Sequence, residues 1–152
     1  MKKEFISGVL VTKVKQISNF NGSVLHMLRS KEKDFKKFGE IYFSEIFPGK
    51  IKAWKKNKKN TQNFVVPIGN ILLVIYDDRN NSRTKGNILE IKLGRPNHYN
   101  RVHIPKNLWY GFSCLGKKTA LIANQIDFIH NKKNSLNLTY NNNKIPYKWE
   151  EN

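Results

Sequence analysis

The stretch GKIKAWKKNKKNTQNFVVPIGNILLVIYDDR, residues 49–79, decides the fold of this chain. Its apolar half, residues 64–76, carries β-branched and aromatic residues on both sides of a Pro-Ile-Gly-Asn sequence. This arrangement predicts two short, buried strands joined by a tight turn. The polar half, residues 55–62, is rich in lysine and asparagine and follows Trp54, and we expect it to face a ligand.

Short apolar segments separated by turn residues continue on both sides of this stretch. Further strands are predicted at residues 6–14, 23–29, 40–47, 51–54, 87–93, 101–104, 109–115 and 119–127. Roughly ten short strands without a long helical pattern are typical of an all-β sandwich or barrel. We expect one domain over residues 1–152, with the polar C-terminal tail, residues 131–152, packing on the body through its aromatic side chains.

Bulk composition narrows the class of protein. A length of 152 residues is about one domain, and no apolar run reaches the roughly 20 residues of a membrane span. We also expect no signal peptide, and a cytoplasmic location is the default. The net charge of +17 fits either a nucleic-acid partner or a lysine-rich background with an anionic small ligand. The lysines are scattered along the whole chain, which favours the second interpretation.

The glycines of the opening stretch show an informative spacing. Five residues separate Gly49 from the tripeptide Lys55-Lys56-Asn57. Four residues then separate Asn57 from Gln62, and six separate Gln62 from Gly69. This resembles the first motif of the cupin jelly-roll fold, in which two histidines and a glutamate occupy the positions of Lys55, Asn57 and Gln62. Lysine donates hydrogen bonds only, and an amide is a poor ligand for a transition metal.

A second segment resembles the other cupin motif, Pro-x-Gly-x-x-His. It begins at Pro105 and places Tyr110 at the position of the metal-binding histidine. The four histidines of the chain show no ligand spacing; they are His26, His98, His103 and His130. We therefore expect a metal-free cupin of the jelly-roll β-barrel or sandwich type, in a single domain.

Within the cupins, the chain resembles the dTDP-4-dehydrorhamnose 3,5-epimerase family. Residues 69–79, GNILLVIYDDR, and 82–86, SRTKG, are similar to the family's G-x-V-x-D-V-x-V-D-x-R and S-P-T-x-G. Residues 104–115, which contain Tyr-Gly-Phe at 110–112, are similar to the family's I-P-x-G-x-x-H-G-F-x-x-L. The resemblance covers about residues 50–127. It implies a nucleotide-sugar substrate, no cofactor, and a homodimer that covers its strand edges.

The resemblance also implies a chemistry. A base removes a proton next to the C4 ketone of the sugar, a cation stabilises the enolate, and an acid returns a proton on the opposite face. Several family positions carry other residues in this chain. The family's catalytic histidine corresponds to Lys55, and the histidine of its H-G-F motif corresponds to Tyr110. The glutamate on its first pocket strand corresponds to His26, and its diphosphate-binding arginine corresponds to Asn21. Its lysine falls near Asn63 and its tyrosine acid falls near Ala123.

We predict Lys55, His26 and Tyr110 as the catalytic residues. The predicted substrate-binding residues are Arg29, Trp54, Asn57, Gln62, Trp109 and Asn124. Each has a structural alternative: a solvated lysine, a core histidine, or an aromatic residue used only in packing.

The sequence supports three functions. The first is an epimerase or isomerase acting on a nucleotide-linked 4-keto sugar. The second is a non-catalytic protein that binds a nucleotide sugar on the same scaffold. The third is a nucleic-acid-binding module that uses the lysine run and the aromatic residues.

Overall fold

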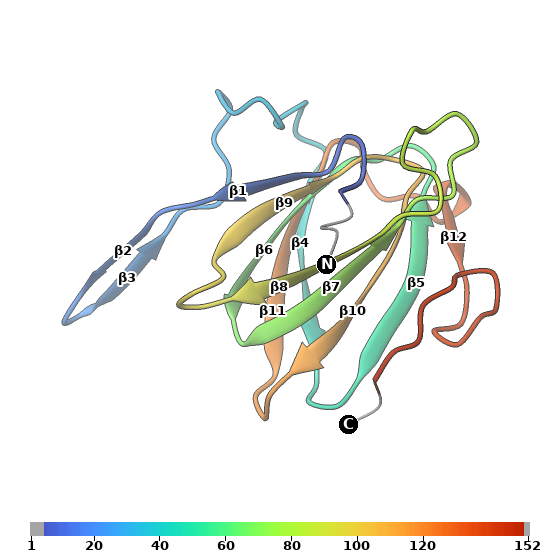
Figure 1. Cartoon of the computed structure of the whole chain (residues 1–152). Helices are drawn as coiled ribbons and strands as arrows, with labels where there is room; N and C mark the ends of the chain where they lie inside the picture. Colours follow the sequence, from blue (N-terminus) through green and yellow to red (C-terminus); the bar gives the residue numbers. More distant parts are fainter. Residues whose placement is uncertain (1–4, 151–152) are drawn as a thin grey trace.

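The computed structural model describes residues 5–150, which form an all-β fold (Figure 1). The strands are β1 (Leu10–Lys13), β2 (Gln16–Asn19), β3 (Gly22–Leu25), β4 (Glu40–Ile46), β5 (Ile51–Asn57), β6 (Gln62–Ile68), β7 (Asn70–Tyr76), β8 (Ile88–Gly94), β9 (Asn100–Ile104), β10 (Trp109–Leu115), β11 (Ala120–Ile126) and β12 (Ser135–Asn137). A short 3-10 helix, Lys132–Asn134, precedes β12. In this described part of the chain, no helix has the length and apolar character needed to cross a membrane.

Two antiparallel sheets of five strands pack face to face as a sandwich (Figure 1). The first sheet has the strand order β1-β9-β6-β11-β4, and the second has the order β12-β5-β10-β7-β8. A separate two-stranded hairpin, β2–β3, projects away from the body. The prediction of an all-β, single-domain sandwich is therefore confirmed.

The chain crosses between the sheets in the middle of the stretch that decides the fold. The two strands predicted there are present, but β6 pairs with β9 and β11, whereas β7 pairs with β8 and β10. The predicted turn joins the two strands, but they do not pair with each other as in a hairpin, because they belong to different sheets. Gly69 lies between them at φ 73°, and a Cβ atom there would be 2.6 Å from the Cα atom of Ala120. Glycine tolerates both this left-handed conformation and this close contact.

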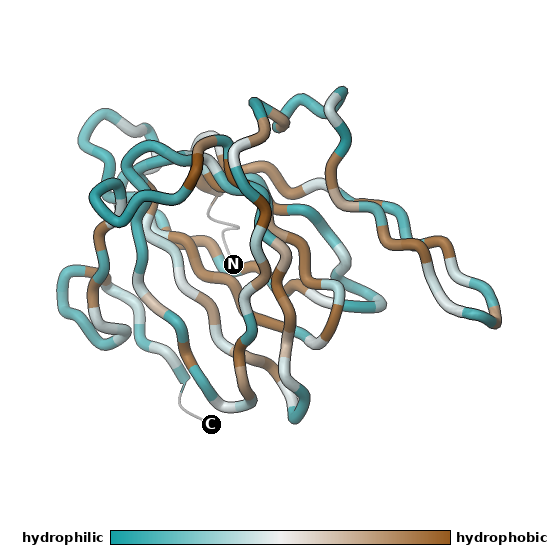
Figure 2. The backbone as a smooth tube through the Cα atoms, turned by 180° about the vertical axis from the view of Figure 1, so that it is seen from behind, coloured by the Kyte–Doolittle hydropathy of each residue, from teal (hydrophilic) through white to brown (hydrophobic). Residues whose placement is uncertain are grey.

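Apolar side chains from the facing strands fill the space between the sheets. Val66, Leu73, Val102 and Ile104 are among the fully buried members of this core. Figure 2 shows apolar segments running through the sheets and hydrophilic loops connecting them. The end of the interior near Gln62 is polar instead, and it is this end that leads to the candidate site.

Predicted and observed strand limits differ most near the two ends of the chain. The strand predicted at 6–14 is shortened to β1, and β2 forms in a segment expected to be polar loop. The strand predicted at 23–29 ends at Leu25, so that His26 lies in a loop. In the tail, β12 pairs with β5, and the ring of Trp149 lies 5.1 Å from that of Trp54.

The Asp-Asp-Arg segment after β7 has a structural role. The Asp77 carboxylate is fully buried and accepts hydrogen bonds from Arg79, Ser82 and Thr84 at 2.6–2.9 Å. Burial alone would raise the pKa of Asp77, but these hydrogen bonds hold it well below its usual range. The network fixes the loop between β7 and β8.

Candidate active site

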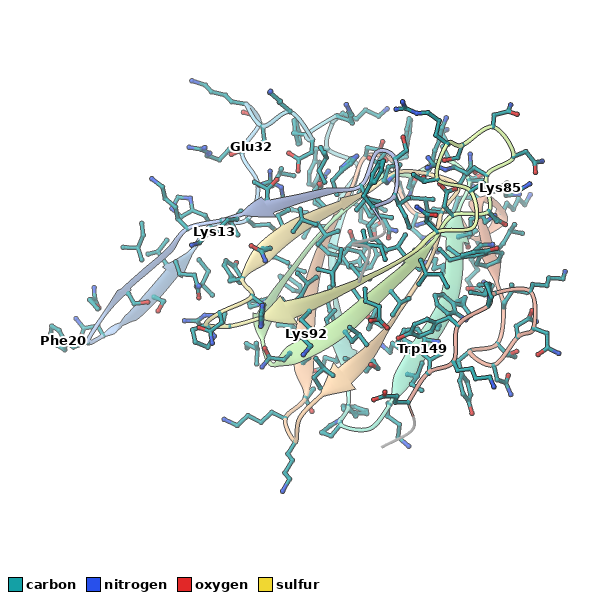
Figure 3. The ribbon with its side chains drawn as sticks, viewed as in Figure 1. Lys13, Phe20, Glu32, Lys85, Lys92 and Trp149 are labelled. Carbon is teal, nitrogen blue, oxygen red and sulfur yellow. The ribbon has the colours of Figure 1, made fainter. Side chains whose placement is uncertain are left out.

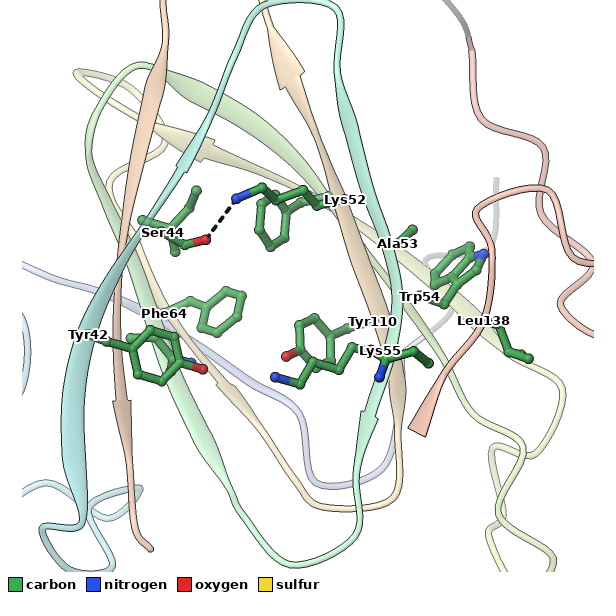
Figure 4. A pocket seen from close by; sticks show the side chains of 13 residues that line it. Tyr42, Ser44, Lys52, Ala53, Trp54, Lys55, Phe64, Tyr110 and Leu138 are labelled. Atoms are coloured by element: carbon green, nitrogen blue, oxygen red, sulfur yellow. Dashed lines mark hydrogen bonds between the residues drawn. The ribbon is translucent and has the colours of Figure 1, made fainter. Parts of the chain in front are cut away.

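A pocket of about 270 Å³ opens where β4 and β5 face each other across the sandwich (Figure 4). Its base is apolar and includes Phe64, Phe112 and Ile122. The polar side chains that line it include Tyr42, Ser44, Lys52, Lys55, Tyr110 and Asn124. A concave apolar site with a few converging polar groups is the usual form of a small-molecule site.

An irregularity in β5 places two lysines in this pocket. Lys52 and Lys55 are three residues apart, so a regular strand would direct them to opposite faces. The register between β5 and β10 shifts between Tyr110 and Phe112, and both lysines therefore line the pocket. Gly111 permits the close approach of the two strands, because a Cβ atom there would lie 2.4 Å from a Cβ atom of β5.

Lys55 is half-buried, and burial lowers the pKa of its amine. Within residues 5–150, no carboxylate forms an ion pair with it. A desolvated lysine without a counter-ion spends more time as the neutral amine, which is the form that accepts a proton. Figure 4 shows the side chain extending into the pocket from β5.

Two amide side chains and two tyrosines form a hydrogen-bonded network beside Lys55. The Tyr110 hydroxyl donates to Gln62 Oε1 at 3.1 Å. Asn124 Nδ2 donates both to Gln62 Oε1 and to the Tyr42 hydroxyl oxygen, each at 2.9 Å. Burial raises the pKa of Tyr110 strongly, so this phenol remains protonated. Asn124 Oδ1 is buried and has no partner in the described chain, which leaves an acceptor for a ligand.

Several predicted residues come together in this pocket. Lys55, Tyr110 and Asn124 line it, and Gln62 connects Tyr110 with Asn124. Asn57 is buried at the end of β5 beside them, and its side chain moderates the raised pKa of Tyr110. The Tyr110 hydroxyl donates to Gln62, so it does not point a free proton at a ligand.

Other predicted residues lie elsewhere. His26 and Arg29 line a separate depression of about 180 Å³, formed by β1, the loop after β3 and Arg101. The reason is that β2 and β3 form a hairpin outside both sheets of the sandwich, and the chain after β3 packs near Tyr99 and Arg101. The structure therefore does not place His26 with Lys55 and Tyr110.

The two predicted tryptophans have packing partners. Trp54 borders the pocket, but its ring packs against Trp149 on the far side of β5 (Figure 4). Trp109 donates from Nε1 to Asp78 at 2.9 Å, and Lys56 lies 4.8 Å from its ring centroid. Trp109 is not among the residues that line the pocket.

Three further pocket residues were not predicted from the sequence: Tyr42, Ser44 and Lys52. In β4 the burial alternates, so Tyr42 and Ser44 face inward with the buried Ile46. No signal in the sequence identifies them, because the outward positions of β4 carry the apolar residues Ile41 and Phe43. Lys52 Nζ donates to Ser44 Oγ at 3.3 Å and to the carbonyl of Glu45, which joins β5 to β4 at the pocket (Figure 4).

A metal site was not expected from the sequence. Across residues 5–150, the structure contains no cluster of three or more His, Cys, Asp or Glu side chains suited to hold a metal ion. The polar side-chain groups at the pocket are amines, amides, phenols and the hydroxyl of Ser44. This set suits hydrogen bonding and proton transfer.

Known proteins resemble this chain in sequence and in fold. The sequence profile of the dTDP-4-dehydrorhamnose 3,5-epimerase family matches residues 4–152. The chain belongs to this family. The resemblance that the motifs indicated is thus confirmed, and it extends over nearly the whole chain.

Individual relatives agree with this assignment. A dTDP sugar isomerase from Desulfovibrio desulfuricans G20 is 42% identical, with a TM-score of 0.93 over 95% of this chain and 92% of that one. A probable low-salt glycan biosynthesis epimerase of Haloferax volcanii is 31% identical over 105 residues, which are 68% of this chain and 67% of that protein.

More distant structures share the fold. The 3,5-epimerase of Legionella pneumophila, solved with dTDP-4-keto-L-rhamnose, is 17% identical, with a TM-score of 0.83 over 95% of this chain and 79% of that one. At this identity the likeness shows the fold alone. The prediction of a cupin-type jelly roll is confirmed.

Proposed function

We propose that this protein is an epimerase or isomerase that acts on a nucleotide-linked 4-keto sugar. The reaction removes a proton from a carbon next to the ketone and returns a proton to it. The observation that carries the proposal is the half-buried amine of Lys55, which has no ion-pair partner within residues 5–150 and lies in the pocket of a chain from this epimerase family.

Lys55 is the proposed base. The ketone acidifies the neighbouring C–H group, and a neutral amine in the pocket can accept its proton. The lowered pKa increases the neutral fraction of Lys55 at moderate pH. A carboxylate partner would have the opposite effect, and none is present in the described chain.

Lys52 and Asn124 are the proposed binding groups. Lys52 gives the pocket a fixed positive charge, which stabilises an anionic oxygen such as that of an enolate. The unpartnered Oδ1 atom of Asn124 accepts a hydrogen bond from a sugar hydroxyl. Tyr110 and Gln62 hold Asn124 in place through their shared hydrogen bonds.

Solvent isotope exchange tests this function. The protein is incubated in deuterated water with a panel of nucleotide-linked 4-keto sugars, and NMR follows deuterium entering the positions beside the ketone. We expect label in at least one sugar. Thermal stabilisation by these sugars without any exchange would instead identify a non-catalytic binding protein, and an absence of both would overturn the proposal.

We also propose that the protein is a homodimer. The β2–β3 hairpin projects from the body, and its apolar side chains Ile17, Phe20 and Val24 are exposed. Phe20 at its tip is 97% exposed and lies far from the rest of the chain (Figure 3). Exposed apolar groups clustered on one element favour an interface, and a second copy would also cover the free edges of the hairpin.

A further inference from the structure

Tyr42 occupies the wall of the pocket opposite Lys55. It lies on β4, the edge strand of the first sheet, where it is paired with Asn124 of β11. Figure 4 shows its hydroxyl group directed into the pocket from β4, while Lys55 extends toward it from β5. The two side chains therefore approach a bound molecule from opposite sides.

The hydrogen bonding of Tyr42 leaves its proton available. Its oxygen accepts a hydrogen bond from Asn124 Nδ2 at 2.9 Å. Within residues 5–150, no protein acceptor receives the O–H group of Tyr42 in return, whereas the O–H group of Tyr110 is donated to Gln62. The hydrogen bond from Asn124 occupies one lone pair of the Tyr42 oxygen, and the O–H group remains able to donate to a molecule in the pocket.

The environment also keeps Tyr42 in its acid form. Burial raises the pKa of its phenol, although the hydrogen bond from Asn124 opposes the rise. At neutral pH the group is therefore protonated. A general acid must carry its proton when the carbanion forms, and Tyr42 meets this condition.

We propose that Tyr42 is the general acid that protonates the reacting carbon on the face opposite Lys55. This assignment rests on the proposed epimerase function. The Lys55 amine accepts the C–H proton, and the C–H electron pair forms the enolate with the ketone oxygen. The enolate carbon then takes the proton of the Tyr42 O–H bond, whose electron pair stays on the phenolate. The ammonium and the phenolate return to their starting states by exchanging one proton with water.

Isotope exchange in a Tyr42→Phe variant separates the two steps. Phenylalanine keeps the ring and removes only the acid. With Lys55 intact, the variant still exchanges the proton beside the ketone for deuterium, within a few-fold of the wild-type rate, but returns it to the same face. We expect formation of the inverted epimer to fall by about 10²-fold or more, as for loss of a general acid.

The matched control is Tyr99→Phe, which removes a hydroxyl that donates to the carbonyl of His26, away from the pocket. It is expected to leave both exchange and epimer formation unchanged.

A Tyr42→Phe variant that is folded by circular dichroism and still inverts the carbon at the wild-type rate overturns the role of Tyr42 while leaving the epimerase function intact. An absence of exchange in the wild-type protein overturns the function itself. Equal loss of exchange and inversion in the variant also contradicts this assignment.

Discussion

Single residues set the chemistry of the pocket. Lys55 is the proposed base; it is half-buried, and no carboxylate of residues 5–150 forms an ion pair with it. A lysine has a much higher intrinsic pKa than a histidine, so it serves as a base only where its surroundings disfavour the charged form. The apolar residues Phe64 and Phe112 beside it provide such surroundings.

The pH dependence of the reaction follows from the two pKa shifts. Lys55 must be neutral, and burial lowers its pKa from 10.5, so isotope exchange is expected to rise with pH to a midpoint below 10.5. Tyr42 must be protonated, and its pKa is raised from 10.0, so epimer formation is expected to decline only above 10.0. The rates of isotope exchange and of epimer formation, measured by NMR as a function of pH, check both expectations. A profile without any rise below 10.5 would contradict the role of Lys55.

Residue types identified part of the site but not all of it. The motif spacing identified Lys55, Tyr110 and Gln62, because these residues occupy positions fixed by the turns of the scaffold. It also suggested His26 as a pocket residue, because a motif position does not reveal that the preceding strand β3 belongs to a hairpin outside the two sheets. Tyr42 was overlooked because β4 contains no recognised motif and because the apolar residues Ile41 and Phe43 on either side of it face outward.

At the scale of elements, the connection between β6 and β7 determines how the sandwich is built. The apolar run and its turn were predictable from local sequence, but the pairing partners were not. Pairing depends on β9, β10 and β11, which are distant in the chain. The strand β12 was unpredictable for the same reason, because its three residues are stabilised by pairing with β5.

Substituting Gly69 tests the importance of this crossing. In Gly69→Ala the left-handed backbone costs about 1–2 kcal/mol, and the new methyl group would meet the backbone of Ala120 at 2.6 Å. Gly116 has a similar φ of 75°, but a Cβ atom there would have nothing within 4 Å. Gly116→Ala is therefore the control. Urea unfolding is expected to show a clearly larger loss of stability for Gly69→Ala, and equal losses would show that the contact with Ala120 is unimportant.

For the whole molecule, the proposed dimer assigns a role to the projecting hairpin. A hairpin of two short strands is marginal in water unless it packs against another surface. The described chain leaves most of β2 and β3 exposed, including Phe20. A second copy of the chain is the proposed partner.

Analytical ultracentrifugation tests this arrangement. We expect the wild-type protein to sediment as a dimer and Phe20→Asp to raise the dimer dissociation constant by at least about tenfold, because an apolar anchor is replaced by a charge. Ile129→Asp changes a residue that is 76% exposed and lies far from the hairpin in the sequence, and it is expected to have no effect. A wild-type protein that is monomeric at all concentrations would contradict the proposal.

Removal of a proton next to the ketone of a nucleotide-linked sugar is the proposed role of the Lys55 amine. Its most direct test compares deuterium incorporation by the wild-type protein, Lys55→Met and Lys58→Met under one condition. Methionine keeps most of the side-chain volume of lysine without its amine, and Lys58 is an exposed neighbour on the same segment. We predict that exchange is lost by about 10²-fold or more in Lys55→Met and unchanged in Lys58→Met. Exchange at the wild-type rate in a folded Lys55→Met protein would contradict the claim.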